Sequence, residues 1–302
     1  RFDVPVSRDL TIANTSGVPA TFLFTERPCA EGEVRGVTPP WLELRVDWPS
    51  DGKKRSGQDE YTLAPGETAN VELTVHIKDL DHVRSLNAGE AKIEDILVLR
   101  VVNGRDHFIS VYGKWLPSCF GRSLEDLTRM PEGGARCLGI APSAEAQSKT
   151  QNVRLSAPRE LFRLTDAISD LTERAVAEWS MTREGPERES PPWSYEPYGT
   201  SWPFRPETWT LKDPDQRSPL LASVREALDT GGSVADIFPP EVPSIHRLEI
   251  LSETLMAFLR SLQDGIITSS VWHDMEQQLA AREKAKLPPR STEESQAWVL
   301  ET

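Results

Sequence analysis

Cys119 is the first residue to weigh as a catalytic nucleophile, because it follows the alternating stretch FISVYGKWLPS and precedes Phe120 and Gly121. A nucleophilic cysteine needs a nearby base or a cationic setting that favours its thiolate. The nearest histidine, His107, lies twelve residues earlier, and no asparagine or aspartate constellation surrounds it. Cysteine is also one of the most frequently buried residue types. We therefore expect Cys119 and Phe120 to be buried structural residues where a strand-rich module ends.

The remaining residues that could do chemistry predict neither a metal site nor a cofactor site. Cys29, Cys119 and Cys137 are too few and too scattered for a disulfide framework or a tetrahedral zinc site. The five histidines never approach His-x-x-x-His spacing. We expect no metal, no cofactor and a reducing compartment, the cytosol.

The charge balance limits the partners. A net charge of −13 argues against non-specific binding of nucleic acid or of an anionic membrane. The one basic run, 53–55, lies in a Gly/Ser/Asp-rich loop and is best interpreted as a solvated loop tip, although a local basic patch stays open. No apolar run approaches the ~18 residues that a membrane span needs.

The first part of the chain has a hydrophobic period of two. Alternating or continuous apolar stretches cover 21–26, 41–48, 70–77, 95–102 and 107–113. The sequences APGET at 64–68 and NGRD at 103–106 supply turns. Several short strands at this spacing predict an all-β immunoglobulin-like sandwich over residues 1–118.

The second part has a period of 3.6 and predicts an all-α domain over residues 155–302, incomplete at its C-terminus. Ser156 is a candidate N-cap with Pro158 in the first turn. The expected helices are 156–179, 218–232, 246–265 and 270–286, and the last ends before two prolines.

Two stretches have the composition of linkers. Residues 119–154 are expected to connect the two domains, because 131–154 has no period and many small or polar residues. Residues 182–206 form a Pro-rich insertion with aromatics between the prolines. It could be a ligand for an aromatic groove; we favour a surface insertion whose aromatics lie loosely on the fold, and assign it no function.

One run is specific enough to indicate a family. Residues 86–121 contain, in order, Leu-Asn-x-Gly-Glu-x-Lys-Ile-Glu-Asp-Ile-Leu-Val-Leu, then Gly-(Arg/Lys)-Asp-x-Phe, then Leu-Pro-Ser-Cys-Phe-Gly. This resembles the ASH module of type II inositol polyphosphate 5-phosphatases, the Lowe-syndrome phosphatase family. The stretch at 45–60 departs from the family pattern and indicates a longer loop.

The α half resembles the RhoGAP-like domain that follows ASH in this family, from APRELFRLTDAI onward. An active RhoGAP inserts an arginine that stabilises charge on the transferred phosphoryl group. The alignment of PETWTLKDPDQRS puts Leu211 at this finger position, and Met256 where active members carry a supporting lysine. The usual Leu-Pro-Glu-Pro corresponds to residues 262–265, LQDG. Arg217 could replace the finger only if the loop changed register. We expect no GAP activity.

The same resemblance implies binding residues. In this family the phenylalanine after Gly-(Arg/Lys)-Asp-x contacts Rab GTPases, and Phe108 matches it. The hydrophobic period alone favours a core position for Phe108, but the resemblance favours an exposed apolar anchor. An aromatic in the first helix of the GAP-like domain docks adaptor peptides in animal relatives, and Phe162 matches that position, where the family has tryptophan.

Two phosphatase signatures of the family, Trp-x-Gly-Asp-x-Asn and Pro-x-Trp-Cys-Asp-Arg, do not occur in the sequence. Because the chain begins with Arg1, we expect a piece of a longer protein whose catalytic domain lies upstream. The leading hypothesis is a non-catalytic targeting region that binds Rab GTPases, and contacts Rho or Rac GTPases without GAP activity, at the cytoplasmic face of endosomal and Golgi membranes. The alternatives are an active GAP for Rho or Rac GTPases and a stand-alone adaptor.

Overall fold

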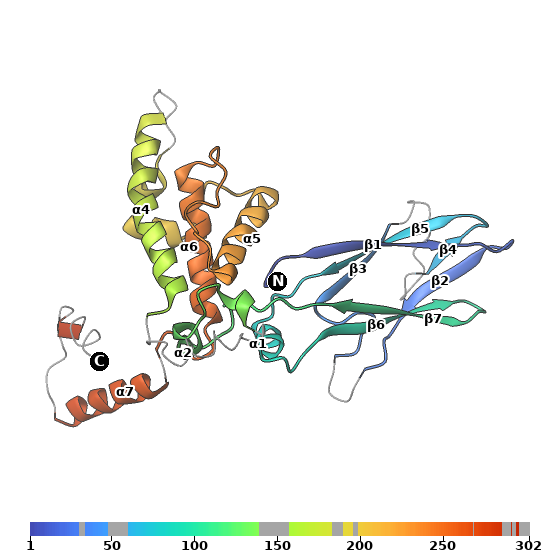
Figure 1. Cartoon of the computed structure of the whole chain (residues 1–302), viewed down its shortest axis with the longest axis horizontal. Coiled ribbons are helices and arrows are strands. Elements are labelled where there is room, and N and C mark those ends of the chain that lie inside the picture. The colour runs from blue at the N-terminus through green and yellow to red at the C-terminus, as the bar shows by residue number, and fades with distance from the viewer. Residues whose placement is uncertain are drawn as a thin grey trace, which may run out of the picture. The chain divides into compact units, whose positions relative to one another are not determined.

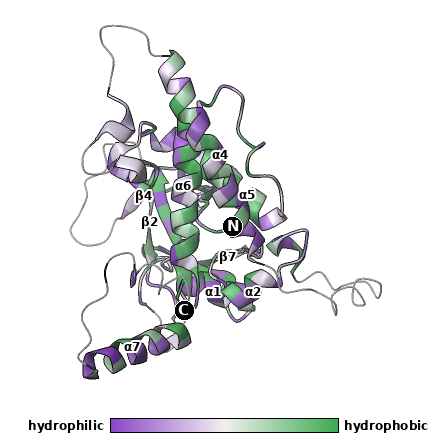
Figure 2. Cartoon of the chain, turned by 90° about the vertical axis from the view of Figure 1, so that its left-hand side faces the viewer, coloured by the Kyte–Doolittle hydropathy of each residue, from purple (hydrophilic) through white to green (hydrophobic). Residues whose placement is uncertain are grey.

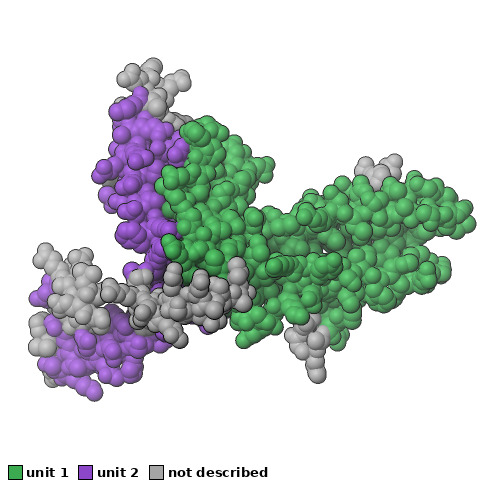
Figure 3. All heavy atoms as spheres, in the orientation of Figure 1, with its two compact units in different colours: residues 1–121, 131–142, 211–241 green, residues 122–130, 143–210, 242–302 purple. Residues whose placement is uncertain are grey.

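The structure is a computed structural model, and it describes residues 1–29, 34–47, 60–138, 157–182, 190–195, 199–267, 269–285, 291 and 294–295. The chain divides into two compact units (Figure 3). Unit 1 comprises residues 1–121, 131–142 and 211–241, and unit 2 comprises residues 122–130, 143–210 and 242–302. The basic run at 53–55, most of the longer loop at 45–60 and the candidate cap Ser156 lie outside the described residues.

Unit 1 contains an antiparallel β-sandwich, which confirms the predicted fold class of the first part (Figure 1). One sheet has the strand order β1-β5-β3 and the other has the order β4-β2-β6-β7. The strands are β1 (Val6–Ala13), β2 (Ala20–Thr25), β3 (Leu42–Asp47), β4 (Tyr61–Leu63), β5 (Thr68–Val75), β6 (Ile93–Val101) and β7 (Asp106–Gly113).

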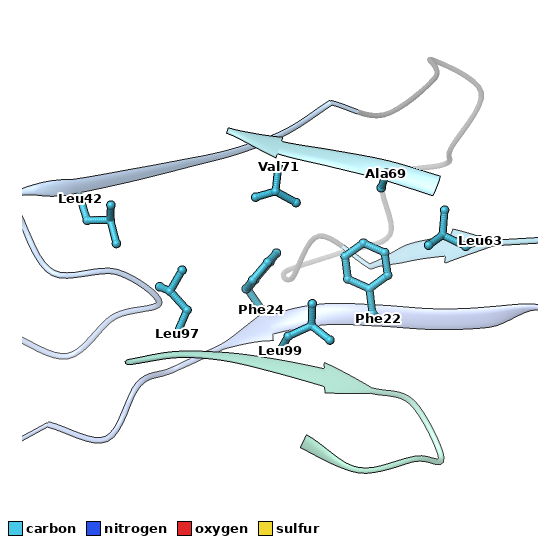
Figure 4. Close-up of a cluster of buried hydrophobic side chains, with 8 residues drawn as sticks. All are labelled: Phe22, Phe24, Leu42, Leu63, Ala69, Val71, Leu97 and Leu99. Carbon is cyan, nitrogen blue, oxygen red and sulfur yellow. The ribbon is translucent and has the colours of Figure 1, made fainter. Parts of the chain in front are cut away.

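The sandwich core is built from the alternation seen in the sequence (Figure 4). Phe22 and Phe24 of β2 project between the sheets, where Leu97 and Leu99 of β6 meet Val71 of β5. Burial of each large apolar side chain stabilises the fold by about 1.5–3 kcal/mol. Since this cluster takes alternate residues of each strand, the intervening residues point to the other side of their sheet. Two of them, Leu23 of β2 and Val98 of β6, are nonetheless buried.

The turns form where the sequence predicts them. Gly66, in APGET, has φ of 80°, and Asn103, in NGRD, has φ of 59°. Glycine reaches this left-handed region without strain, and asparagine tolerates it better than most residues. The second turn joins β6 to β7 and so fixes the register of Val98 opposite Phe108.

Helix α1 (Leu80–Ala88) was not expected from the sequence. Asp79 caps its N-terminus by accepting a hydrogen bond from the His82 N–H at 2.8 Å, and Gly89 ends it in the left-handed conformation. The helix has only nine residues and buries Val83 and Leu86, so it is shorter than the stretch of about 11–18 residues over which a helical period is recognised.

Part of the expected linker is regular structure. Residues 119–138 include α2 (Leu124–Thr128) and the 3-10 helix η1 (Ala135–Cys137), while residues 139–154 lie outside the described part of the chain. Helix α5 (Pro214–Thr230) groups with the sandwich in unit 1 rather than with the other long helices. The domain boundaries at 118 and 155 therefore differ from the boundaries of these units, and they stay a prediction.

Unit 2 contains α2, α4 (Arg159–Thr182), α6 (Ser244–Ser261) and α7 (Ser269–Lys284), so the predicted helical character of the second part is confirmed. The antiparallel packing of α4 and α6 is fixed at one end by Glu178, whose carboxylate accepts the Ser244 N–H at 3.1 Å. At the other end of α6 the Gln263 N–H donates to the Arg122 carbonyl at 3.0 Å. Helix α7 buries none of its side chains, and Figure 2 shows hydrophobic and hydrophilic residues mixed along it.

The expectation that the aromatics of the Pro-rich insertion lie loosely is wrong for Trp193 and Trp202, whereas Tyr195 is 52% exposed, as expected. Trp202 is buried, and Trp193 lies between it and Trp179 of α4, with ring centroids 5.6 and 5.8 Å away. The Thr208 hydroxyl donates to the Trp202 carbonyl at 2.9 Å. Large aromatic surfaces gain more from such packing than from solvent exposure, despite the surrounding prolines.

None of the helices in the described part of the chain is both long enough and apolar enough to cross a membrane. Among the same residues, no three His, Cys, Asp or Glu side chains gather closely enough to hold a metal ion.

Candidate protein-binding surface

The outer face of β6 and β7 is the main candidate site. Ile109 and Val111 of β7 pack against the sandwich core, so Phe108, Ser110 and Tyr112 face outward. Directly opposite them on β6 lie outward-facing partners, because cross-strand neighbours share a face. The pairs, in order along the strands, are Arg100–Asp106, Val98–Phe108, Ile96–Ser110 and Glu94–Tyr112. We call these eight residues the β7 face.

The β7 face exposes large apolar side chains. Phe108 is 67% exposed, Tyr112 83% and Ile96 40%. Single exposed apolar residues are common, but three on adjoining strand positions of one face indicate an interaction surface. The exposed position expected for Phe108 is thus confirmed, and the core alternative that the period allowed is wrong.

A bidentate ion pair holds one end of this face. The Arg100 guanidinium donates to both carboxylate oxygens of Asp106, at 2.8 Å each. The hydrogen bond that Arg100 donates to Asp106 raises the pKa of Arg100, and the same bond lowers the pKa of Asp106. Both charges are therefore compensated within the hairpin, next to Val98 and Phe108. Strand β7 is an edge strand of its sheet, so a partner can approach from the side as well as from above.

The opposite end is bounded by a second ion pair. Arg27, which follows β2, lies 2.9 Å from Asp95 of β6, and both side chains are largely buried. Arg27 also donates to the Val34 carbonyl at 3.2 Å. Beside this pair is a hollow of about 590 Å³. Its lining includes Glu94, Ile96 and Tyr112 of the β7 face.

Cys119 lies in a buried polar cluster of unit 1. It is 1% exposed, and its N–H donates to the Asp229 carboxylate at 2.7 Å. The Ser118 hydroxyl donates to the same oxygen at 3.0 Å, and Arg136 forms an ion pair with the other oxygen at 3.1 Å. Phe120 stacks on Phe2 with centroids 4.7 Å apart. The burial predicted for Cys119 and Phe120 is therefore confirmed.

Asp229 is the centre of this cluster, which joins α5 to the end of the sandwich. Burial raises the pKa of Asp229, while the Arg136 charge and the hydrogen bonds from Cys119 and Ser118 oppose that effect. A carboxylate with three donors aimed at it is a structural acceptor. The cluster explains why the Ser-Cys-Phe stretch follows the last strand: its backbone and side chains complete the contact with α5.

The finger position carries no exposed side chain. Leu211 is 5% exposed, and its carbonyl accepts a hydrogen bond from the Arg217 guanidinium at 2.6 Å. Arg217 lies in the first turns of α5 and is half-buried. This bond directs Arg217 back onto the loop before its own helix, so the register change that would present it as a finger is not the arrangement observed.

The remaining residues singled out in the sequence lie in unit 2. Phe162, on α4, is 65% exposed. Met256, on α6, is partly buried. In the LQDG segment Leu262 is buried, and the Asp264 carboxylate accepts the Leu124 N–H at the start of α2 at 3.1 Å. That segment thus has a structural role in joining α6 to α2.

Sequence reasoning missed Tyr112, Ile96 and Glu94. The available signal was strict alternation: once Phe108 is placed outward, residues 110 and 112 must share its face. The cross-strand partners on β6 required the register, which the turn at 103–106 fixes.

Comparison with known proteins supports the resemblance found in the motifs. Residues 1–115 match the family model described as the ASH domain of OCRL-like inositol polyphosphate 5-phosphatases. The chain is also 29% identical, over 276 residues, to a protein of Mus musculus named type II inositol 1,4,5-trisphosphate 5-phosphatase. The alignment covers 88% of this chain and 22% of that relative. The chain thus resembles an ASH-containing, phosphatase-related region and spans about a fifth of the relative's length.

Proposed function

We propose that this chain is a targeting and protein-interaction region of a phosphoinositide 5-phosphatase, and that it binds Rab-type small GTPases through the β7 face. The observation that carries the proposal is the 67% exposure of Phe108, on the same face of the sheet as the exposed side chains of Ile96 and Tyr112. An aromatic anchor flanked by apolar neighbours has the composition of an interaction hot spot. The phosphatase relative supports the class of parent protein, whose catalytic domain would be a separate part.

We further propose that the chain has no GTPase-activating activity. Leu211 offers no charge to a transition state, and the Arg217 guanidinium is engaged by the Leu211 carbonyl at 2.6 Å. Finger placement must hold to a fraction of an ångström, so an arginine six residues away is no substitute without refolding of the loop. Contact with Rho or Rac GTPases would then be binding alone.

Membrane association would be indirect in this proposal. A GTP-loaded Rab anchored in an endosomal or Golgi membrane would recruit the chain from the cytoplasm, and the net charge of −13 disfavours direct binding to anionic lipid. A second candidate contact is Phe162, whose 65% exposure on α4 suits an amphipathic adaptor peptide.

The experiment is calorimetric titration of the chain with a panel of Rab GTPases loaded with a non-hydrolysable GTP analogue. For any Rab that binds the wild-type chain, Phe108→Val should weaken the binding at least tenfold, as expected for a central aromatic anchor. Phe162→Val is the matched control, because that side chain is equally exposed but lies on α4. Equal affinities of wild type and Phe108→Val would contradict the proposed site.

A further inference from the structure

The hollow at one end of the β7 face has a lining suited to a long basic side chain. Ile96, Tyr112 and Pro28 give it apolar walls, and Glu94 adds a carboxylate to its lining. Tyr112 and Glu94 are directly opposed in the strand register, so ring and carboxylate flank the same point on the face.

Glu94 is the acidic group of this hollow that is open to a partner. Arg27 and Asp95 compensate each other at 2.9 Å. In the described part of the chain, Glu94 forms neither an ion pair nor a side-chain hydrogen bond, and its side chain is exposed. Lys92 and Lys114 flank the last strand pair, Ile93–Gly113, but neither is ion-paired to Glu94 within the described residues.

Tyr112 adds a second feature that favours a cation. At 83% exposure, its ring is open to a guanidinium or ammonium group, and aromatic rings attract such cations. Phe108 and Tyr112 are four positions apart on one face, which corresponds to about 13 Å along a strand. An apolar anchor and a cation site therefore lie at a fixed spacing on one surface.

We propose that the hollow between Glu94 and Tyr112 binds a lysine or arginine side chain of the GTPase that occupies the β7 face. The aliphatic stem lies against Ile96 and the Tyr112 ring, and the cationic head reaches the Glu94 carboxylate. This inference rests on the proposed function and specifies what the partner's surface must present: an apolar residue for Phe108 and, about 13 Å away, a basic residue for the hollow. The basic residue gives specificity, whereas Phe108 gives most of the affinity.

The first test uses any GTP-loaded Rab that binds the wild-type chain. Glu94→Gln should weaken binding about threefold to tenfold and flatten its dependence on salt. Tyr112→Leu should weaken it by a similar factor, while Tyr112→Phe, which keeps the ring, should not. Glu43→Gln is the matched control, because it removes one exposed carboxylate from β3 of the other sheet. If Glu94→Gln equals Glu43→Gln while Phe108→Val abolishes binding, this inference is wrong and the proposed function stands.

The second test needs no GTPase. Two acetylated, amidated pentapeptides, with leucine first and either arginine or glutamate fifth, are titrated against the isotope-labelled chain by NMR. The arginine peptide should bind at least threefold more tightly and shift the amides of Glu94, Ile96 and Tyr112, and Glu94→Lys should reverse the preference. Should no Rab bind, this result would uphold the basic-residue site while the Rab proposal fails. No preference between the peptides would overturn the inference.

Discussion

The Asp229 carboxylate should be essential to the stability of unit 1. It is 2% exposed and accepts hydrogen bonds from the Cys119 N–H at 2.7 Å and the Ser118 hydroxyl at 3.0 Å. It also pairs with Arg136 at 3.1 Å. Asp229→Ala would remove the acceptor that the Cys119 N–H and the Ser118 hydroxyl share and one partner of Arg136, and loss of a buried hydrogen-bond partner costs about 1–3 kcal/mol.

The expected loss for Asp229→Ala is about 3 kcal/mol, at the low end of the range for breaking a buried ion pair. The low end applies because Arg136 keeps other partners: the Glu226 carboxylate at 2.7 Å and the Leu116 carbonyl at 2.9 Å. Asp229→Asn keeps one oxygen as the acceptor for Cys119 and Ser118. It replaces the oxygen that pairs with Arg136 by an amide NH2 group, so the charge and that one ion pair are lost, and the cost should be smaller, about 1.5 kcal/mol.

The assay is urea unfolding, with hydrogen exchange of the Cys119 amide as a local measure of the same free energy. Glu226→Ala is the matched control, since Glu226 pairs with the same arginine from the same helix but is 31% exposed. Its loss should stay below about 1 kcal/mol. The reasoning is refuted if Asp229→Ala costs no more than Glu226→Ala, or if the Cys119 amide exchanges equally fast in both variants.

Three further predictions follow from other parts of the chain. Gly134→Ala should destabilise unit 1 by more than about 3 kcal/mol, because φ of Gly134 is 72° and an added Cβ would lie 2.4–2.8 Å from backbone atoms at the C-terminal end of α5. Gly66→Ala is the control: φ of Gly66 is 80° but the space around it is open, so this substitution should cost about 1 kcal/mol, and equal urea midpoints for the two variants would contradict the prediction. Burial lowers the pKa of His82 below its ordinary 6.5, while the Asp79 charge opposes this effect, so protonation of His82 is less favourable in the folded state than in the unfolded state. The contribution of His82 to the free energy of unfolding should therefore be complete above pH 6.5 and decrease as the pH falls below 6.5. Urea unfolding at several pH values should show a smaller decrease for His82→Gln than for the wild type. Single-turnover GTP hydrolysis by Rho and Rac GTPases should be accelerated less than tenfold by the chain, and equally little by Arg217→Ala; a hundredfold acceleration lost in that variant would show that Arg217 is a finger after all.

The sandwich could be predicted from the sequence because each strand carries its own alternation. Phe22, Phe24, Leu97 and Leu99 enter one core, as period-two burial requires. The short helix α1 was missed because nine residues are fewer than the about 11–18 over which a helical period is recognised, although Asp79 and Gly89 are residue types that commonly cap helices. The long helices α4, α5 and α6 carried apolar faces and were predicted.

Contacts between distant residues were beyond sequence reasoning. Ser118 and Asp229 are 111 positions apart, and nothing in the helical pattern around Asp229 shows that it turns toward the sandwich end. The packing of Trp193 and Trp202 was missed for a related reason: proline predicts the absence of regular structure but not the absence of burial. Phe108 was ambiguous by period, and the family resemblance favoured the exposed alternative that the structure has.

The most direct test of the account is hydrogen exchange of the chain with and without a GTP-loaded Rab that binds it. The account predicts that amides of β6 and β7, residues 93–101 and 106–113, exchange more slowly in the complex, and that Phe108→Val removes this protection. Protection confined to α4 and α6, with both strands unchanged, would contradict the claim that the β7 face is the binding surface.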